Sequence, residues 1–310
     1  MKPLVSIIMN CKNGESFLKE SLDSILVQTY KNWELIFVDN ASKDKSKKIF
    51  DNYHDERFKY FNIKEEVNLG TARQVALQNC SGEFISFLDT DDIWFENKLE
   101  DQIELFKESD IGMVISNTIF FSGKKEKVFY LKAPPTGEVF YDLLKKYYIS
   151  LETLICRKKY LDQLYFEFDE EYSMISDMDL TLRLSLICKL AYCPKILSKW
   201  RVHNKSDTWN KKDLFFSEQI SLIEKLTHIN GNDKNIKFLK SKKNFLNNIY
   251  FSLILNRIEN EKSLNRIEIV KEILKKKMRF KNLIILFLLT LLPFKNLFFK
   301  FYRLIFSINP

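Results

Sequence analysis

The chain has 310 residues, of which 45% are hydrophobic and 29% charged, so it can bury a large core and lacks the composition of a disordered protein. Its five cysteines form no Cys-x-x-Cys pair and only three histidines are present, which argues against a zinc site and for a reducing compartment. The net charge is +8, but nine basic residues and one acidic residue fall in 271–310, so residues 1–270 are neutral. A neutral body argues against a nucleic-acid partner.

Short apolar runs alternate with helical patterns along the first 120 residues. Strands are predicted at 5–9, 34–38, 58–62, 84–88 and 112–116, and helices at 16–28, 42–52 and 70–80. This alternation predicts a Rossmann-like α/β fold, with a mostly parallel sheet and helices on both faces. Farther along, 139–165 and 177–190 have helical patterns, and polar helices with apolar stripes are expected at 213–278.

The same patterns divide the chain into three parts. Residues 1–210 are expected to form the α/β domain, residues 211–280 a C-terminal helical extension, and residues 281–310 a basic, hydrophobic tail.

Polar side chains follow three of the predicted strands at the point where each strand ends. Asn10 to Asn13 follow the first, Asp39 ends the second, and Asp89 to Asp92 follow the strand FISFL. Ligands of parallel sheets bind beyond the carboxyl ends of the strands, so these loops predict a functional site at one rim.

The stretch FISFLDTDDIWF places three carboxylates, Asp89, Asp91 and Asp92, within four residues and without a Lys or Arg among them. Like charges this close repel one another, so they must face water or a cation. Oxygen ligands suit a hard divalent cation such as Mn2+ or Mg2+, which often bridges to phosphates. A solvated acidic loop without a metal is the alternative, because short D-x-D matches are common.

Four motifs follow one another along the chain. The opening VSIIMNCKNGESFLKESLDSILVQTYKNWELIFVDNASKD precedes NLGTARQVALQNCSGEFISFLDTDD, then SDMDLTLRL at 176–184 and WRVHNKS at 200–206. In this order they resemble bacterial family 2 glycosyltransferases of the GT-A fold, over roughly residues 3–208. The resemblance implies an inverting, metal-dependent glycosyltransferase, with a nucleotide-sugar half at about 1–117 and an acceptor half at about 118–210.

The resemblance implies that residues of the first half bind the donor. Asp39 is expected to bind the base or ribose of a UDP-sugar or other nucleotide-diphosphate sugar, and Asn10 and Lys12 to face the same nucleotide. Arg73 is expected near the nucleotide or the aspartate cluster, and Asp89 at the ribose.

A metal and a general base are also implied by the resemblance. Asp89 and Asp91, supported by Asp92, are expected to hold Mn2+ or Mg2+ on the diphosphate, with His203 approaching the metal or the diphosphate. Asp177 matches the position of the general base. The chemistry agrees, since a metal neutralises a diphosphate leaving group and a carboxylate can accept the proton of an attacking hydroxyl.

The chain departs from the family pattern at three places. The segment NCKN at 10–13 stands where P-T-Y-N is usual, so Lys12 replaces an aromatic residue that can stack on the base. Asn40 stands where a second Asp is common, and Ser176 where Glu usually precedes the base. Because of these changes, a family member with impaired catalytic activity is an alternative to an active enzyme.

The family also implies a glycan or lipid-linked glycan acceptor in surface polysaccharide synthesis, and a peripheral or monotopic place on the cytoplasmic face of the inner membrane. Two other functions compete with this interpretation. One is a haloacid-dehalogenase-type phosphatase, in which the first Asp of D-x-D is the nucleophile, and the other a non-catalytic sugar-nucleotide-binding membrane scaffold. Asp177 could also simply cap the helix that it opens.

The tail predicts contact with the membrane surface. Residues 282–294 form a run of thirteen residues without a charge, which is shorter than the roughly twenty residues that a spanning helix needs. Basic residues flank this run on both sides, and each adds about 1 kcal/mol near an anionic leaflet. A helix packed on the body and a re-entrant hairpin are the alternatives.

We expect a chain that ends near Lys271 to be soluble and still able to hydrolyse the donor. The full chain should sediment with membranes and be partly released by high salt, because screening weakens its attraction to anionic lipids. Sedimentation of both chains with and without salt checks this. A full-length protein that stays soluble and monomeric without detergent rules the anchor out.

Overall fold

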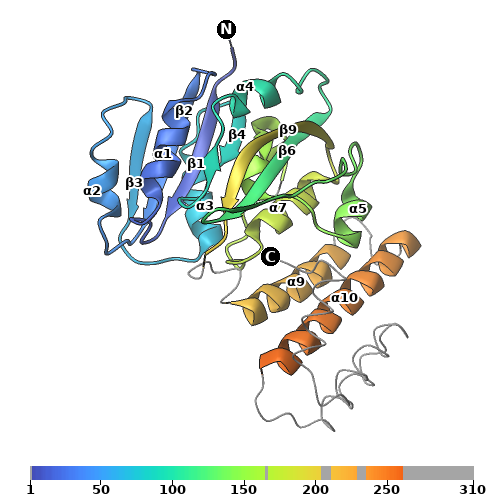
Figure 1. Ribbon diagram of the computed structural model, residues 1–310. Coiled ribbons are helices and arrows are strands. Elements are labelled where there is room, and N and C mark those ends of the chain that lie inside the picture. The colour runs from blue at the N-terminus through green and yellow to red at the C-terminus, as the bar shows by residue number, and fades with distance from the viewer. Residues whose placement is uncertain (1, 165–166, 204–210, 229–234, 261–310) are drawn as a thin grey trace. The chain divides into compact units, whose positions relative to one another are not determined.

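The computed structural model describes residues 2–164, 167–203, 211–228 and 235–260 (Figure 1). Its contacts divide the chain into two compact units, Met1–Asn210 and Lys211–Pro310. The tail at 281–310, and with it the expected membrane contact, lies outside the described residues. Within the described ranges, no helix has the length and apolar character needed to cross a membrane.

The first unit is built around one sheet. Its strands are β1 (Val5–Cys11), β2 (Trp33–Asn40), β3 (Phe58–Ile63), β4 (Phe84–Phe87), β5 (Ile93–Trp94), β6 (Ile111–Ser122), β7 (Lys125–Val128), β8 (Ile155–Arg157) and β9 (Lys189–Arg201). Its helices are α1 (Leu18–Leu26), α2 (Ser46–Phe50), α3 (Leu69–Gln78), α4 (Lys98–Ile103), α5 (Phe140–Lys145), α6 (Lys158–Leu161) and α7 (Ser176–Leu184), with a 3-10 turn η1 at Leu151–Thr153.

The strands lie in the order β3-β2-β1-β4-β8-β6-β9-β5, and β7 pairs with β6. The first four are parallel, as the alternation of strands and helices predicted. The second half is mixed, because β8 runs antiparallel to both β4 and β6, and β5 antiparallel to β9, while β6 and β9 are parallel. The α/β prediction is therefore confirmed, and the mostly parallel pairing holds only for the first half of the sheet.

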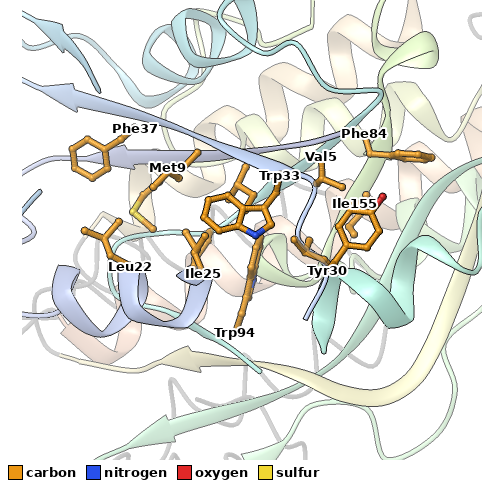
Figure 2. Close-up of a cluster of buried hydrophobic side chains, with 14 of the residues drawn as sticks. Val5, Met9, Leu22, Ile25, Tyr30, Trp33, Phe37, Phe84, Trp94 and Ile155 are labelled. Carbon is orange, nitrogen blue, oxygen red and sulfur yellow. The ribbon is translucent and has the colours of Figure 1, made fainter. Parts of the chain in front are cut away.

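The core lies on the face of the sheet that α1 covers. Figure 2 shows Leu22 and Ile25 of α1 against Met9, Trp33 and Phe37 of the strands, and all five side chains are buried. Burial of each such side chain stabilises the fold by about 1.5–3 kcal/mol. Side chains of a strand alternate between the two faces of the sheet. The residues that alternate with these core residues along β1 and β2 therefore point to the other face, where α3 contacts both strands.

The prediction of one helix over 139–165 is wrong. Helix α5 ends at Lys145, and the chain continues through η1 into β8 before the short helix α6. Strand β8 fills the place between β4 and β6, where Ile155 and Cys156 are fully buried. A short apolar run fits a buried strand as well as a buried helix. Here the run forms a strand because it can pair with β4 and β6 in the sheet.

The second unit contains α9 (Lys212–Thr227) and α10 (Ile236–Asn260) within its described residues. Helix α9 buries Leu222 and Leu226, and α10 buries Phe238. Lys242 of α10 donates hydrogen bonds to Glu224 at 2.6 Å and Thr227 at 2.9 Å, which joins the two helices.

Glycine is required at position 70, where α3 packs on the segment that leads into α7. The amide of Gly70 donates to the carbonyl of Tyr172 at 3.1 Å. A Cβ at Gly70 would lie 2.3 Å from the carbonyl oxygen of Asp169 and 2.6 Å from that of Tyr172. Both are main-chain atoms, so the backbone itself must move to admit a methyl group.

We therefore expect Gly70→Ala to lower the free energy of unfolding by about 1–3 kcal/mol, because the overpacking exceeds the roughly 1 kcal/mol that alanine gains in a helix. Thermal and urea unfolding measure the change. Gln78→Ala, at an exposed position of the same helix, is the control and should stay within about 0.5 kcal/mol of the wild type. An unchanged or raised stability of Gly70→Ala contradicts the close approach.

Candidate active site

The three predicted loops meet at one edge of the sheet. Strand β1 pairs with β2 on one side and β4 on the other, and Cys11 is the partner of Asp39 in the ladder. The segment from Asn10 to Asn13, Asp39, and Asp89 to Asp92 therefore lie at neighbouring strand ends. Parallel strands align their carboxyl ends, which is why residues distant in sequence converge here.

Side chains and main-chain amides tie the loops after β1 and β2 together. The amide of Asn13 donates to the hydroxyl of Ser42 at 2.9 Å, and the amide of Lys43 donates to the side-chain oxygen of Asn13 at 2.8 Å. The amide of Gly14 donates to the hydroxyl of Ser46 at 2.9 Å. Asn13 has a φ of 53°, a left-handed conformation that Asn tolerates better than most residues. Each loop is therefore held in shape by the other.

Asp39 is fixed at the floor of this region. Only 3% of it is exposed, and its carboxylate accepts hydrogen bonds from the amide of Ser42 at 2.9 Å and the hydroxyl of Tyr60 at 2.7 Å. Each carboxylate oxygen can accept a further bond. Burial and the Asp39 charge raise the pKa of Tyr60, which keeps its hydroxyl protonated as a donor.

Asn10 lies near the carboxyl end of β1, and Lys12 directly follows the strand. The side-chain nitrogen of Asn10 is buried and makes no hydrogen bond to the described part of the chain. A buried donor without an acceptor is costly, so this atom fits a polar ligand. Lys12 forms an ion pair with Glu66, and both side chains are largely exposed.

The three carboxylates of the D-x-D stretch point in different directions. The side chains of Asp89 and Asp91 are 42% and 28% exposed, whereas Asp92 is 1% exposed. Asp92 turns inward and accepts a hydrogen bond from the amide of Arg201 at 2.9 Å. Asp89 and Asp91 are thus the two that a ligand at the rim can reach.

The side chains that contact these carboxylates come from distant parts of the chain. Arg73 of α3 is buried, and its guanidinium lies 3.6 Å from Asp89 and donates to the hydroxyl of Ser176 at 2.5 Å. His203 contacts Asp91 through Nε2 at 2.8 Å. Arg73 thereby connects the D-x-D loop to the first residue of α7.

Arg201 also supports this loop, and the sequence reasoning missed it. Its Nε donates to the carbonyl of Asp91 at 2.8 Å, and its guanidinium forms an ion pair with Glu20 at 2.8 Å. The guanidinium carbon lies 4.4 Å and 4.5 Å from the ring centres of Phe17 and Phe121. The available signal was its place in the motif WRVHNKS, two residues before His203.

Negative charge at the rim is only partly compensated. Burial raises the pKa of Asp92, and the neighbouring carboxylate of Asp91 adds to the rise. Loss of hydration also raises the pKa of Asp89. The charge of Arg73 opposes this rise, and the charges of Asp91 and Asp177 add to it. Because Asp89 keeps much of its surface in water, solvent limits its shift. The remaining repulsion favours a further cation at this place.

The donor atoms fit a divalent ion that arrives with a phosphate ligand. Among the described residues, no group of three or more His, Cys, Asp or Glu is placed to hold a metal by itself. Mg2+ is commonly bound by one or two carboxylates together with substrate phosphates and water. Asp89 and Asp91 match that number.

Asp177 lies inside the first turn of α7. The helix begins at Ser176 and its N-cap is Ile175, so Asp177 is not the N-cap residue that the alternative interpretation requires. The hydroxyl of Tyr147 donates to the Asp177 carboxylate at 3.3 Å and lies 3.2 Å from the hydroxyl of Thr181. Asp177 is partly exposed, and its charge acts on Asp89, so the two carboxylates face one region.

A second buried group behind β4 was not predicted. Lys98 is fully buried, its Nζ donates to the hydroxyl of Ser86 at 2.7 Å, and it lies 4.1 Å from the ring centre of Trp94. Burial lowers the pKa of Lys98 and raises that of Glu152. The indole of Trp94 donates to the carbonyl of Glu152 at 2.8 Å. These contacts hold the strand that carries the D-x-D loop.

Comparison with known proteins agrees with this arrangement. A family model described as glycosyl transferase family 2 matches residues 6–164, half of the chain. The UDP-Glc:alpha-D-GlcNAc-diphosphoundecaprenol beta-1,3-glucosyltransferase WfgD of Escherichia coli is 32% identical over 67% of this chain and 81% of that protein. The putative teichuronic acid biosynthesis glycosyltransferase TuaG of Bacillus subtilis is 28% identical over 68% of this chain and 83% of that protein. An uncharacterised glycosyltransferase of Rickettsia typhi is 31% identical over 66% of each chain.

Solved structures share the fold at lower identity. TarS of S. aureus in complex with UDP-GlcNAc is 18% identical, with a TM-score of 0.67 over 88% of this chain and 80% of that one. The mannosyltransferase PcManGT of Pyrobaculum calidifontis in complex with GDP-Man and Mn2+ is 16% identical, with a TM-score of 0.59 over 94% of this chain and 88% of that one. The sheet order, the family model and these relatives together show that the chain has the GT-A fold and belongs to glycosyl transferase family 2.

Proposed function

We propose that the chain transfers a sugar from a UDP-sugar or other nucleotide-diphosphate sugar to a hydroxyl of a glycan or lipid-linked glycan, with inversion at the anomeric carbon. The observation that carries the proposal is the position of Arg73, which contacts both Asp89 and Ser176. It brings the D-x-D loop and the start of α7, with Asp177, to one region. A donor and an acceptor can therefore meet between them.

The nucleotide is assigned to the carboxyl ends of β1 and β2 and the loops that follow them. Asp39 has a fixed carboxylate with capacity for further hydrogen bonds, which suits a base or ribose hydroxyl. The unpartnered nitrogen of Asn10 supplies a donor, and Lys12 can leave its exposed pair with Glu66 for the nucleotide at little cost.

The diphosphate is assigned to the D-x-D loop. Asp89 and Asp91, with His203 beside Asp91, are the residues that would hold Mn2+ or Mg2+, and the buried Asp92 supports them through β9. When bound, the metal supplies positive charge that stabilises the departing diphosphate. Arg73 adds a fixed positive charge beside Asp89.

Asp177 is assigned as the general base. Its carboxylate accepts the proton of the acceptor hydroxyl while the hydroxyl oxygen attacks the anomeric carbon and the bond from that carbon to the diphosphate breaks. A single displacement of this kind inverts the anomeric centre. Tyr147 orients the carboxylate through its hydroxyl, whose pKa is raised by burial and by Asp177.

The acceptor is assigned by analogy with the curated relatives. WfgD is named for a GlcNAc-diphosphoundecaprenol acceptor and TuaG for teichuronic acid synthesis, which supports a lipid-linked glycan in bacterial surface polysaccharide synthesis. Such an acceptor places the enzyme at the cytoplasmic face of the inner membrane. The family assignment sets aside the phosphatase alternative, and an activity assay separates the enzyme from a non-catalytic scaffold.

Metal dependence tests the D-x-D assignment. Purified full-length protein is incubated with UDP-glucose, UDP-GlcNAc or GDP-mannose, and release of the nucleotide is measured. We expect excess EDTA to lower the rate at least about 100-fold, and Mn2+ or Mg2+ to restore it, because the leaving diphosphate loses several kcal/mol of stabilisation. Full activity in EDTA contradicts the metal assignment, and no hydrolysis of any donor supports the scaffold.

Asp177→Asn tests the base. The amide keeps the size of the side chain and cannot accept the proton, so transfer should fall about 10²- to 10⁴-fold while the fold and donor binding persist. Circular dichroism checks the fold, and binding of UDP checks the donor site. Unfolding of the variant, with normal specific activity in the folded fraction, assigns Asp177 a structural role instead.

A further inference from the structure

Five aromatic side chains form a continuous row on β6, the segment after β7, and β9. Ring centres lie 4.6 Å apart between Trp200 and Phe120, 4.8 Å between Phe120 and Phe129, and 4.5 Å between Phe129 and Tyr130. Tyr192 follows at 5.5 Å from Tyr130. All five side chains are partly exposed rather than buried.

Phe120 and Trp200 of this row lie on the face of the sheet opposite Arg201. Phe120 is the ladder partner of Trp200, whereas Phe121 is the partner of Arg201. Side chains alternate along a strand, so Phe120 and Trp200 share the other face.

Tyr130 connects the row to the segment that contacts the proposed base. The hydroxyl of Tyr130 donates to the carbonyl of Tyr148, and the preceding residue, Tyr147, donates to Asp177. Asn117 fixes Tyr130 by bonding its main-chain amide and carbonyl, each at 3.0 Å. Tyr130 therefore lies beside the segment whose Tyr147 contacts the proposed base.

We propose that this aromatic row binds sugar rings of the acceptor, an inference that rests on the proposed function and adds where the acceptor lies. Aromatic faces pack on the C–H face of a sugar, while its hydroxyls need polar groups at the edge. The hydroxyl of Tyr147 at the base supplies one such group. Lys127, the ladder partner of Phe120, places a second polar side chain beside the rings.

Two other roles predict different behaviour. Rings that only join neighbouring strands contribute about 0.2–1 kcal/mol to stability for each pair and do not recognise a ligand. A surface for the lipid chain of an acceptor prefers longer alkyl groups and is indifferent to the sugar.

The test measures binding of methyl and octyl β-glycosides of glucose and N-acetylglucosamine by saturation-transfer difference NMR, with full-length protein in the presence of UDP and Mn2+. We expect the wild type to bind at least one methyl glycoside through its ring protons. Phe129→Leu keeps apolar bulk and removes the ring face, so affinity should fall about tenfold, the equivalent of about 1.4 kcal/mol. Phe129→Tyr should restore binding.

Phe95→Ala is the matched control, because Phe95 is 36% exposed and lies under Lys199 away from the row. It should bind glycosides as the wild type does, and thermal unfolding checks that all variants are folded. No methyl glycoside bound by the wild type, equal affinity in Phe129→Leu, or binding of octyl glycosides alone each overturns the proposal. Failure of the proposed function has a different signature, namely no hydrolysis of any sugar nucleotide by the wild type.

Discussion

The repulsion among three carboxylates at the end of β4 is the constraint on which the rest of the site depends. Arg73 on α3 pairs with Asp89, and Arg201 at the end of β9 and His203 just beyond it bond to Asp91, although all three are far away in sequence. Asp92 is placed inside, where a main-chain amide stabilises it, and Asp89 and Asp91 stay at the rim. The loop can form only when α3, β4 and β9 are all in place, so the fold and the site are specified together.

The sequence was informative where local pattern and tertiary structure agree. Apolar runs such as ELIFV predicted the parallel strands, and parallel strands then placed Asp39 at the same edge of the sheet as the loop that carries Asp89. It was uninformative where a distant partner decides. The strand β8 could not be distinguished from a helix, because its three residues acquire their ladder from β4 and β6.

Side-chain partners were harder to predict than positions. Arg73 was expected near the nucleotide or the aspartates, and its bond to Ser176 has no local signature, because 103 residues separate the two. A lysine in a polar segment is normally assigned to the surface, yet Lys98 is buried against Trp94. The hydroxyl of Ser86 accepts a hydrogen bond from the buried ammonium, and neither composition nor periodicity predicts such a partner.

The loops after β1 and β2 stabilise each other's conformation through hydrogen bonds. Asn13 and Ser42 form part of one hydrogen-bonded network, so the energies of substitutions in the two loops are not additive. A replacement in one loop alters the shape of the other, and its effect depends on which residue stands there. With the donor bound as proposed, its preference is a joint property of both loops, and variants that exchange the loops as a pair retain a geometry that single exchanges lose.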